Sequence, residues 1–278
     1  MNLDSSSILI RSCRGFEELA ACVELQVDVW GYLDRDVVPR RVFTVAQKIG
    51  GQVIGAFDTA PPGVNPEGDP DNLVGFAMAL PGISGGHPYL HSHMLAVNPH
   101  YRNQGIGRRL KLFQREEALG RGIGRMEWTF DPLEIKNSFL NIVKLGAIVR
   151  RYASNFYGVT SSRLHGQIPT DRLYAEWWLE SDWVRSILGG KAAASPAIEQ
   201  EISVPHQIAH WRHSPLDQGR VLDIQSRNRE HFEKAFARQL AVIGFRIDPE
   251  GNGVFQLGRW QERMGSSPSL QPVSDRFS

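Results

Sequence analysis

The sequence has little cysteine, almost no net charge and no long apolar run. Its 278 residues include only two cysteines, Cys13 and Cys22, which are too few for a disulfide framework or a zinc site. No segment approaches the roughly 18 apolar residues of a membrane-spanning helix. Residues 1–10 lack a basic region followed by an apolar stretch, so we expect that they are not a leader peptide. We therefore expect free thiols in a reducing compartment, and a cytoplasmic protein that binds neither a metal nor a membrane.

The charges nearly cancel, with 31 Lys and Arg residues against 30 Asp and Glu residues. Such a balance produces no overall field that would gather nucleic acid on the surface, so any basic site must be local. We therefore expect no nucleic-acid partner. The length corresponds to about two domains, or to one domain with a large extension.

Hydrophobic periodicity predicts alternating strands and helices over roughly the first two thirds of the chain. Strands are expected near residues 8–10, 52–57, 73–80, 90–97, 125–130, 147–157 and 172–179, and helices near 16–30, 39–49, 106–120 and 134–145. Gly146 occupies the capping position after the last of these helices. Beyond it, a strand near 202–205, a helix near 222–241 and a hairpin of 242–247 with 254–257 are expected.

The composition changes at Ser181, where Gly, Ala, Ser and Pro become frequent. We divide the chain there into a domain of residues 1–181 and an extension of residues 182–264 that packs on it. Large aromatic residues, among them Trp183, are expected to line the contact between the two. Residues 265–278 contain little that could be buried, so we expect a disordered tail.

The most informative segment runs from Leu95 to Arg109. Gly105 and Gly107 leave the backbone N–H groups unobstructed where a helix begins, and the helix dipole favours an anion there. The basic residues between 100 and 125 are Arg102, Arg108, Arg109, Lys111, Arg115, Arg121 and Arg125, against Glu116 and Glu117. These features indicate a cradle for a ligand with several phosphates, although a simple turn before a solvated basic helix has the same pattern.

Two other phosphate-binding motifs do not fit this segment. A Walker A loop needs Lys and then Ser or Thr after its last glycine, whereas Arg108 and Arg109 follow here. A dinucleotide-binding loop needs three glycines after the first strand of its unit, and this segment offers two after about the fourth strand.

The run Arg102-Asn103-Gln104-Gly105-Ile106-Gly107 resembles the signature of the GNAT superfamily of acyl-CoA N-acyltransferases. The order of elements over residues 7–181 is also similar, most closely to a bacterial subgroup with a long C-terminal extension. The resemblance implies an α+β fold: a mixed, mostly antiparallel and splayed sheet flanked by helices, with the C-terminal α/β extension added to it.

The resemblance also implies where acyl-CoA binds. The pantetheine arm would lie between the strands at 90–97 and 125–130, paired with the backbone of Leu95 and Val97. The pyrophosphate would lie on the loop formed by Arg102, Asn103, Gln104, Gly105, Ile106, Gly107 and Arg108. Asn137 would contact the arm, or would only solvate the start of its helix.

Acyl transfer to an amine needs a group that accepts the amine proton. His91 and His93 share one face of their strand by period-two alternation, with Ser92 and Met94 on the other face. His93 lies close to the expected thioester position and is the candidate base, although histidines in strands are often structural.

The candidate acid departs from the family pattern. The resemblance assigns the acid to the position of Ile142, which has no proton to donate. Tyr152, Tyr157 or water would replace it, or the protein would bind acyl-CoA without rapid transfer. The histidines near residue 210 lack the Glu of a His-Glu-x-x-His zinc motif, so we expect no metal.

We thus expect an acetyl-CoA-dependent acyltransferase that acts on an amine of a small molecule or a protein. The sequence leaves the oligomeric state open and is compatible with a homodimer. A non-catalytic acyl-CoA-binding or regulatory module is the alternative. A third possibility, a basic patch for nucleic acid, is disfavoured by the net charge of +1.

Overall fold

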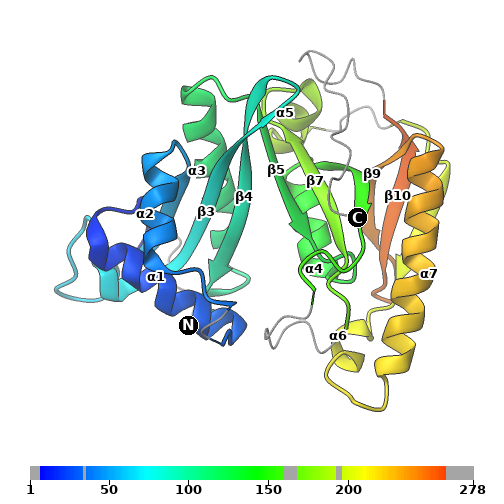
Figure 1. Cartoon of the computed structure of the whole chain (residues 1–278), viewed down its shortest axis with the longest axis horizontal. Helices are drawn as coiled ribbons and strands as arrows, with labels where there is room; N and C mark the ends of the chain where they lie inside the picture. Colours follow the sequence, from blue (N-terminus) through cyan, green and yellow to red (C-terminus); the bar gives the residue numbers. More distant parts are fainter. Residues whose placement is uncertain (1–6, 34–35, 159–167, 192–195, 261–278) are drawn as a thin grey trace. The chain divides into compact units, whose positions relative to one another are not determined.

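The computed structural model describes residues 7–33, 36–158, 168–191 and 196–260. The described residues divide into two compact units, one up to Met126 and one from Glu127 on (Figure 1). Both units are α+β with mostly antiparallel strands flanked by helices, as predicted. None of the helices within these ranges has the length and hydropathy needed to cross a bilayer.

The first unit is a four-stranded sheet in the order β1-β2-β3-β4, with helices on both faces. Its elements are β1 (Ile8–Ser12), α1 (Gly15–Trp30), α2 (Arg40–Lys48), β2 (Gln52–Asp58), η3 (Pro70–Asn72), β3 (Leu73–Ser84), β4 (His87–Val97), η4 (Pro99–Tyr101) and α3 (Ile106–Gly120). All three strand pairs are antiparallel.

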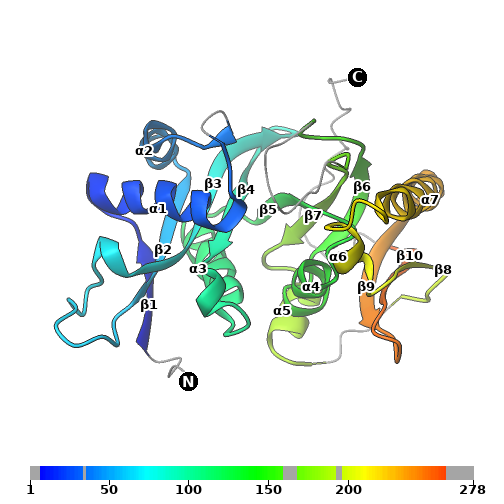
Figure 2. The same cartoon turned by 90° about the horizontal axis from the view of Figure 1, so that it is seen from below.

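Two apolar clusters hold the first unit together. Phe43, Phe57 and Phe76 are fully buried on the face that α1 and α2 cover. On the opposite face, Ile106 and Leu110 of α3 pack against β2 and β3. Figure 2 shows α1 and α2 on one side of these strands and α3 on the other. This sandwich holds α3 in a defined position over β4.

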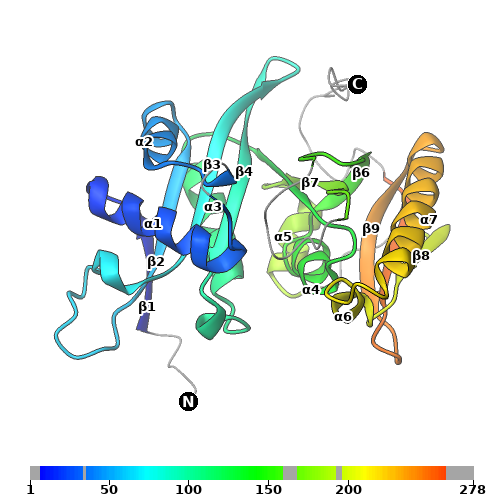
Figure 3. The same ribbon diagram turned by 60° about the horizontal axis from the view of Figure 1, so that its bottom comes forward.

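The second unit continues with strands in the order β5-β7-β6-β9-β10-β8. Its elements are β5 (Arg125–Phe130), which begins in the first unit, α4 (Ile135–Ser138), the π-helix η5 (Phe139–Lys144), β6 (Ile148–Ala153), β7 (Arg172–Trp178), α5 (Asp182–Leu188), β8 (Gln200–Val204), α6 (Ile208–Trp211), α7 (Gln218–Ala237), β9 (Leu240–Ile247) and β10 (Gly253–Arg259). Helix α7 contacts β6, β8 and β9, and Figure 3 shows it beside β9.

The strands after residue 181 extend the sheet of the second unit. β9 pairs antiparallel with β6 through Val149 and Val242. Trp183 donates a hydrogen bond from its indole N–H to the Gly146 carbonyl oxygen at 3.1 Å. Along the chain, the boundary between the two compact units follows Met126. It therefore falls within residues 1–181, which the sequence analysis assigns to one domain. Because contacts do not establish which segments fold alone, the boundary at residue 181 stays a prediction.

Some elements differ from the sequence-based expectations. The structure adds the short helices α5 and α6, and the helix expected near 134–145 changes from α4 to the wider η5. α7 starts at Gln218 and ends at Ala237, because Gln239 reverses the chain with a φ of 61° and β9 begins at Leu240. The tail of residues 265–278 lies outside the described residues.

Buried ion pairs connect the helices of the second unit to its strands. The Asp171 side chain is fully buried and accepts hydrogen bonds from Tyr152 Oη at 2.5 Å and from Arg229 Nη2 at 2.8 Å. Arg212 likewise donates to Asp131 and Glu134, at 2.7 Å each. Removing one partner of such a pair leaves an uncompensated buried charge.

Asp171→Asn is therefore expected to lower the free energy of unfolding of the second unit by about 3 kcal/mol. The matched control is Asp182→Asn, whose ion pair with Arg185 at 2.9 Å is exposed, and which should change the free energy by less than about 0.5 kcal/mol. Urea denaturation followed by tryptophan fluorescence measures both. Equal losses in the two variants would contradict a special role for Asp171.

Candidate functional site

A glycine-bearing loop joins β4 to α3 in the first unit. Asn98 caps the short turn η4, because its side chain accepts a hydrogen bond from the His100 N–H at 3.0 Å. Asn103 and Gly105 then adopt left-handed conformations, with φ of 63° and 78°. No heavy atom lies within 4 Å of the place that a Cβ would occupy at Gly105. Backbone conformation, rather than crowding, therefore favours glycine there.

The backbone N–H groups of this loop point away from protein acceptors. Within the described ranges, none of the N–H groups from Asn103 to Arg108 donates a hydrogen bond, and the Arg109 N–H is the first to do so, to the Gly105 carbonyl oxygen at 3.0 Å. The positive end of the α3 dipole lies at the same place. Successive free N–H groups beside left-handed residues form a concave surface that suits an anion.

Two arginines border the loop. Arg102 is exposed, and its Nε donates to the Val97 carbonyl oxygen at 3.3 Å. Arg108 is half-buried, and its buried Nε has no hydrogen-bond partner in the part of the chain described. An unpaired buried donor is costly, so an anionic oxygen that reached it would be stabilised.

The basic cluster predicted from the sequence is smaller in the structure. Three of its members are already bound within the protein: Arg109 Nη2 to the Ile8 carbonyl oxygen at 2.6 Å, Lys111 Nζ to Ser92 Oγ at 2.7 Å, and Arg121 Nη2 to Glu117 Oε2 at 2.8 Å. Of the other four members, Arg102 and Arg108 are the two that flank the glycine loop in sequence.

Strand β4 carries a bulge at His93. Met94 pairs with Met78 and Ser92 with Ala79, so His93 has no opposite residue on β3. Ser92 contacts α3 through Lys111, whereas Met94 lies in the cluster under α1 and α2. The prediction that Ser92 and Met94 share one face is therefore wrong, because one extra residue reverses the alternation.

The sequence of residues 32–136 matches the family model described as the acetyltransferase (GNAT) family. The matched stretch includes β2 to β5 and the whole glycine loop. Residues 32–136 belong to the GNAT family of acetyltransferases. No curated protein matches the chain.

The chain is similar to several solved acetyltransferase structures at low sequence identity. One is the ribosomal-protein-S18-alanine N-acetyltransferase from Escherichia coli, with 16% identity over 61% of this chain and 92% of that chain, and a TM-score of 0.46. Another is an N-acetyltransferase from Staphylococcus aureus Mu50, with 14% identity over 62% and 99%, and a TM-score of 0.48. A third, from Elizabethkingia anophelis, has acetyl-CoA bound, with 15% identity over 63% and 99%, and a TM-score of 0.44.

His93 lies in the GNAT segment with its side chain half-buried. Burial lowers the pKa of His93 below the usual value, because the charged imidazolium loses solvation. The ring centroids of His91 and His93 are 6.3 Å apart. A neutral imidazole at neutral pH is the form that accepts a proton.

Asn137 lies in the second unit, on the short helix α4. Its side chain is exposed, and its Oδ1 accepts a hydrogen bond from Asn141 Nδ2 at 3.3 Å. Asn141 in turn accepts from the Trp128 indole N–H at 3.2 Å. Asn137 thus ends a polar chain that leads to a buried tryptophan, and its role toward a ligand stays a prediction.

The side chains considered as acids differ in their suitability. Ile142 is buried in η5 and has no proton to donate. Burial and the hydrogen bond to Asp171 raise the pKa of Tyr152 far above its usual value, so the structure opposes its use as an acid. Tyr157 is partly exposed, and its Oη lies 3.1 Å from Thr129 Oγ1.

The sequence analysis assigned Lys111 to the basic cluster and did not predict that it is buried. Lys111 is only 3% exposed and lies on the inner face of α3. Ser92, its acceptor, donates in turn to Gln114 Oε1 at 3.0 Å. Burial lowers the pKa of Lys111 well below the usual value. Its spacing from Ile106, Leu110 and Gln114 on one helix face is the signal that could have revealed it.

The described residues bring no three His, Cys, Asp or Glu side chains together in a way that could hold a metal ion.

Lys111→Met is expected to change how stability depends on pH. Because the pKa of Lys111 is lower in the folded than in the unfolded chain, the unfolded chain binds more protons at pH values between the two, and stability rises with pH in that range. Between about pH 8 and 10, the wild-type free energy of unfolding should rise more steeply than that of Lys111→Met, by up to about 1.4 kcal/mol per pH unit.

Urea denaturation at each pH gives this slope. Lys48→Met, which replaces an exposed lysine at the end of α2, is the matched control and should keep the wild-type slope. If Lys111→Met also kept it, Lys111 would be solvated in the folded chain.

Proposed function

We propose that this chain is an acyl-CoA-dependent N-acyltransferase that moves an acetyl or another short acyl group to an amine of a small molecule or a protein. One observation carries the proposal: among the described residues, the N–H groups from Asn103 to Arg108 of the GNAT segment have no protein acceptor at the start of α3. A pyrophosphate offers the oxygens that such groups bind. The open space at Gly105 and the unpaired Nε of Arg108 fit the same group.

The residues that precede the loop have a proposed role as well. Leu95 and Val97 lie at the end of β4. Their side chains pack against the apolar cluster that contains Ile106 and Leu110 of α3. Their packing keeps the backbone of β4 rigid where a pantetheine arm would pair with it. Asn137 is proposed as a further contact of that arm.

The proposed chemistry needs one residue of this chain to move a proton. His93 accepts the proton of the amine, directly or through a water molecule, as the nitrogen bonds to the thioester carbon and the carbon–sulfur bond breaks. The departing thiolate has an ordinary pKa of about 8.5 and needs little help from an acid at neutral pH. Ile142 in the family's acid position is therefore compatible with turnover.

A non-catalytic acyl-CoA-binding module is the second candidate. Two observations favour it: Ile142 is buried and inert, and Tyr152 is held by Asp171. This candidate predicts that the chain binds acyl-CoA and releases no free CoA with any amine.

Gly107→Asp tests the binding of CoA. A Cβ at Gly107 would lie 3.5 Å from Leu95 Cδ2, which is an ordinary contact, so Gly107→Ala should fold and bind CoA normally. The carboxylate of Gly107→Asp adds negative charge beside the pyrophosphate, so calorimetry should show affinity reduced at least about tenfold. If a folded Gly107→Asp variant binds CoA as tightly as Gly107→Ala, the loop is not the pyrophosphate site.

His93→Gln tests catalysis separately from binding. We expect turnover, measured as free CoA released with a panel of amines, to fall by about 10²-fold or more, while CoA affinity stays nearly unchanged. The wild-type rate should rise with pH through a group whose pKa lies below about 6.5, because burial lowers the pKa of His93, and His93→Gln should lack this rise. A normal rate and pH profile in His93→Gln would remove His93 from the mechanism, and binding without turnover in the wild type would favour the binding module.

A further inference from the structure

One buried contact ties the turn before the glycine loop to a distant strand. Tyr101, the last residue of η4, donates from its hydroxyl to Asp58 Oδ2 at 2.8 Å. Asp58 ends β2, stands 43 positions earlier in the chain and is only 3% exposed. Its Oδ1 accepts a second hydrogen bond, from the Ala60 N–H at 3.0 Å. The acyl-CoA proposal uses neither side chain, although its loop begins directly after Tyr101.

The sheet of the first unit brings Tyr101 and the end of β2 together. Both β2 and β4 pair antiparallel with β3, so they run in the same direction and finish at the same end of the sheet. Phe57 of β2 pairs with Leu73 of β3, and Val97 of β4 pairs with Gly75. The ring of Tyr101 packs against the apolar cluster that also holds the start of α3. Packing thus fixes the ring, and the carboxylate fixes the hydroxyl.

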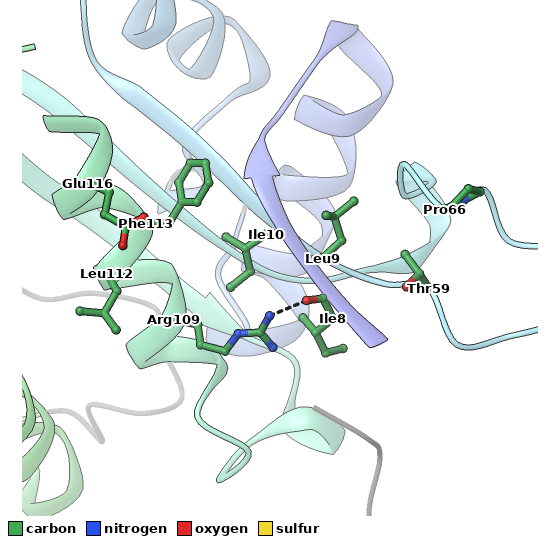
Figure 4. Close-up of a pocket in the computed structure, with 9 residues that line it drawn as sticks. All are labelled: Ile8, Leu9, Ile10, Thr59, Pro66, Arg109, Leu112, Phe113 and Glu116. Carbon is green, nitrogen blue, oxygen red and sulfur yellow. Dashed lines mark hydrogen bonds between the residues drawn. The ribbon is translucent and has the colours of Figure 1, made fainter. Parts of the chain in front are cut away.

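The other end of the loop is attached to the sheet as well. Arg109 Nη2 donates to the Ile8 carbonyl oxygen at 2.6 Å, and this bond joins α3 to β1 (Figure 4). Both residues line a hollow of about 490 Å³ that opens between α3 and β1. Tyr101 and Arg109 therefore bracket the N–H groups from Asn103 to Arg108, and each is bonded to a different strand of the sheet.

The loop between these two attachments has few restraints of its own. Among the described residues, its N–H groups from Asn103 to Arg108 donate no hydrogen bond, and Asn103 has a left-handed conformation with a φ of 63°. That conformation costs free energy for residues other than glycine. A loop without attachments would therefore spend part of its time in other conformations. A ligand that needs the left-handed one would then bind more weakly, in proportion to the fraction of chains that have it.

We propose that Tyr101 and Asp58 are positioning residues, which hold the glycine loop in the conformation that binds the pyrophosphate of acyl-CoA. This role rests on the proposed function, because it concerns the same loop. Neither side chain needs to touch the ligand, since both act through the backbone of the loop. Burial and the hydrogen bond to Asp58 raise the pKa of Tyr101 above its usual value, so the hydroxyl remains a donor at neutral pH.

Calorimetry of the full chain with CoA tests this role, because it measures the Kd and the number of binding sites separately. Tyr101→Phe keeps the ring and removes the hydroxyl, so we expect the Kd for CoA to rise about tenfold while the stoichiometry stays unchanged. A merely structural loss would leave a fraction of the chains unfolded, which lowers the stoichiometry and not the affinity. Tyr89→Phe, the same change near the start of β4, is the matched control and should bind CoA like the wild type.

Variants of Asp58 test whether the hydrogen bond itself is responsible. Asp58→Ala removes the acceptor and should weaken CoA binding as Tyr101→Phe does. Asp58→Asn can still bond to both partners, because its amide nitrogen can donate to the Tyr101 oxygen while its carbonyl oxygen accepts from Ala60. It should therefore bind CoA more tightly than Asp58→Ala. In the Asp58→Ala background, adding Tyr101→Phe should cause no further loss, since the two side chains act as one unit.

A wild type that binds CoA, together with an unchanged Kd in a folded Tyr101→Phe variant, would overturn this role and leave the proposed function intact. Equal losses in Tyr101→Phe and Tyr89→Phe, or a full second loss in the double variant, would also overturn it. The melting temperature of each variant shows whether it folds. Should Tyr101→Phe not fold, equal affinities of Asp58→Ala and Asp58→Asn would contradict the role. A wild type that binds no CoA would overturn the proposed function and this role together.

Discussion

The packing of α3 against the sheet of the first unit is the interaction on which the candidate site depends. Ile106 and Leu110 are buried against β2 and β3, so the start of the helix cannot shift when a ligand approaches. The N–H groups of the preceding loop are therefore oriented before binding, and no ordering cost opposes an anion that reaches them. The inner face of the same helix carries Lys111, which donates to Ser92 of β4, and another side of the helix borders the hollow beside β1.

The second unit is organised by a different constraint, which is the pairing of buried charges. Asp171 binds Tyr152 and Arg229, and these contacts join the strands to α7. Such pairs hold their partners in defined positions even where their net contribution to stability is small, since breaking one leaves a charge in a poorly solvated place. The Tyr152 hydroxyl is thus already bonded to Asp171, and the chemistry proposed for this chain relies on His93 and on an easily expelled thiolate.

Much of the fold was predictable because its signals are local. Hydrophobic periodicity, together with glycines at the ends of elements, located most strands and helices. The loop around Gly105 was predictable because glycine readily adopts a positive φ. The helix α5 was missed because its seven residues are too short to show a period. The prediction that Ser92 and Met94 share one face of β4 was wrong. A bulge arises from the register of β4 with β3, and the period-two pattern of β4 alone does not show where a bulge lies.

The amino-acid sequence was enough to predict the glycine loop before α3, the GNAT resemblance that this loop carries and the approximate order of the elements. These depend on backbone conformation and on spacings within a few residues. The folded structure was needed to show that Lys111 is buried against Ser92 and that Tyr152 is held by Asp171. It was also needed to show that Arg108 Nε has no partner among the described residues. Each of these depends on which side chains from distant segments share a low-dielectric interior, and the free energy of a charge there is set by neighbours that the local sequence does not name.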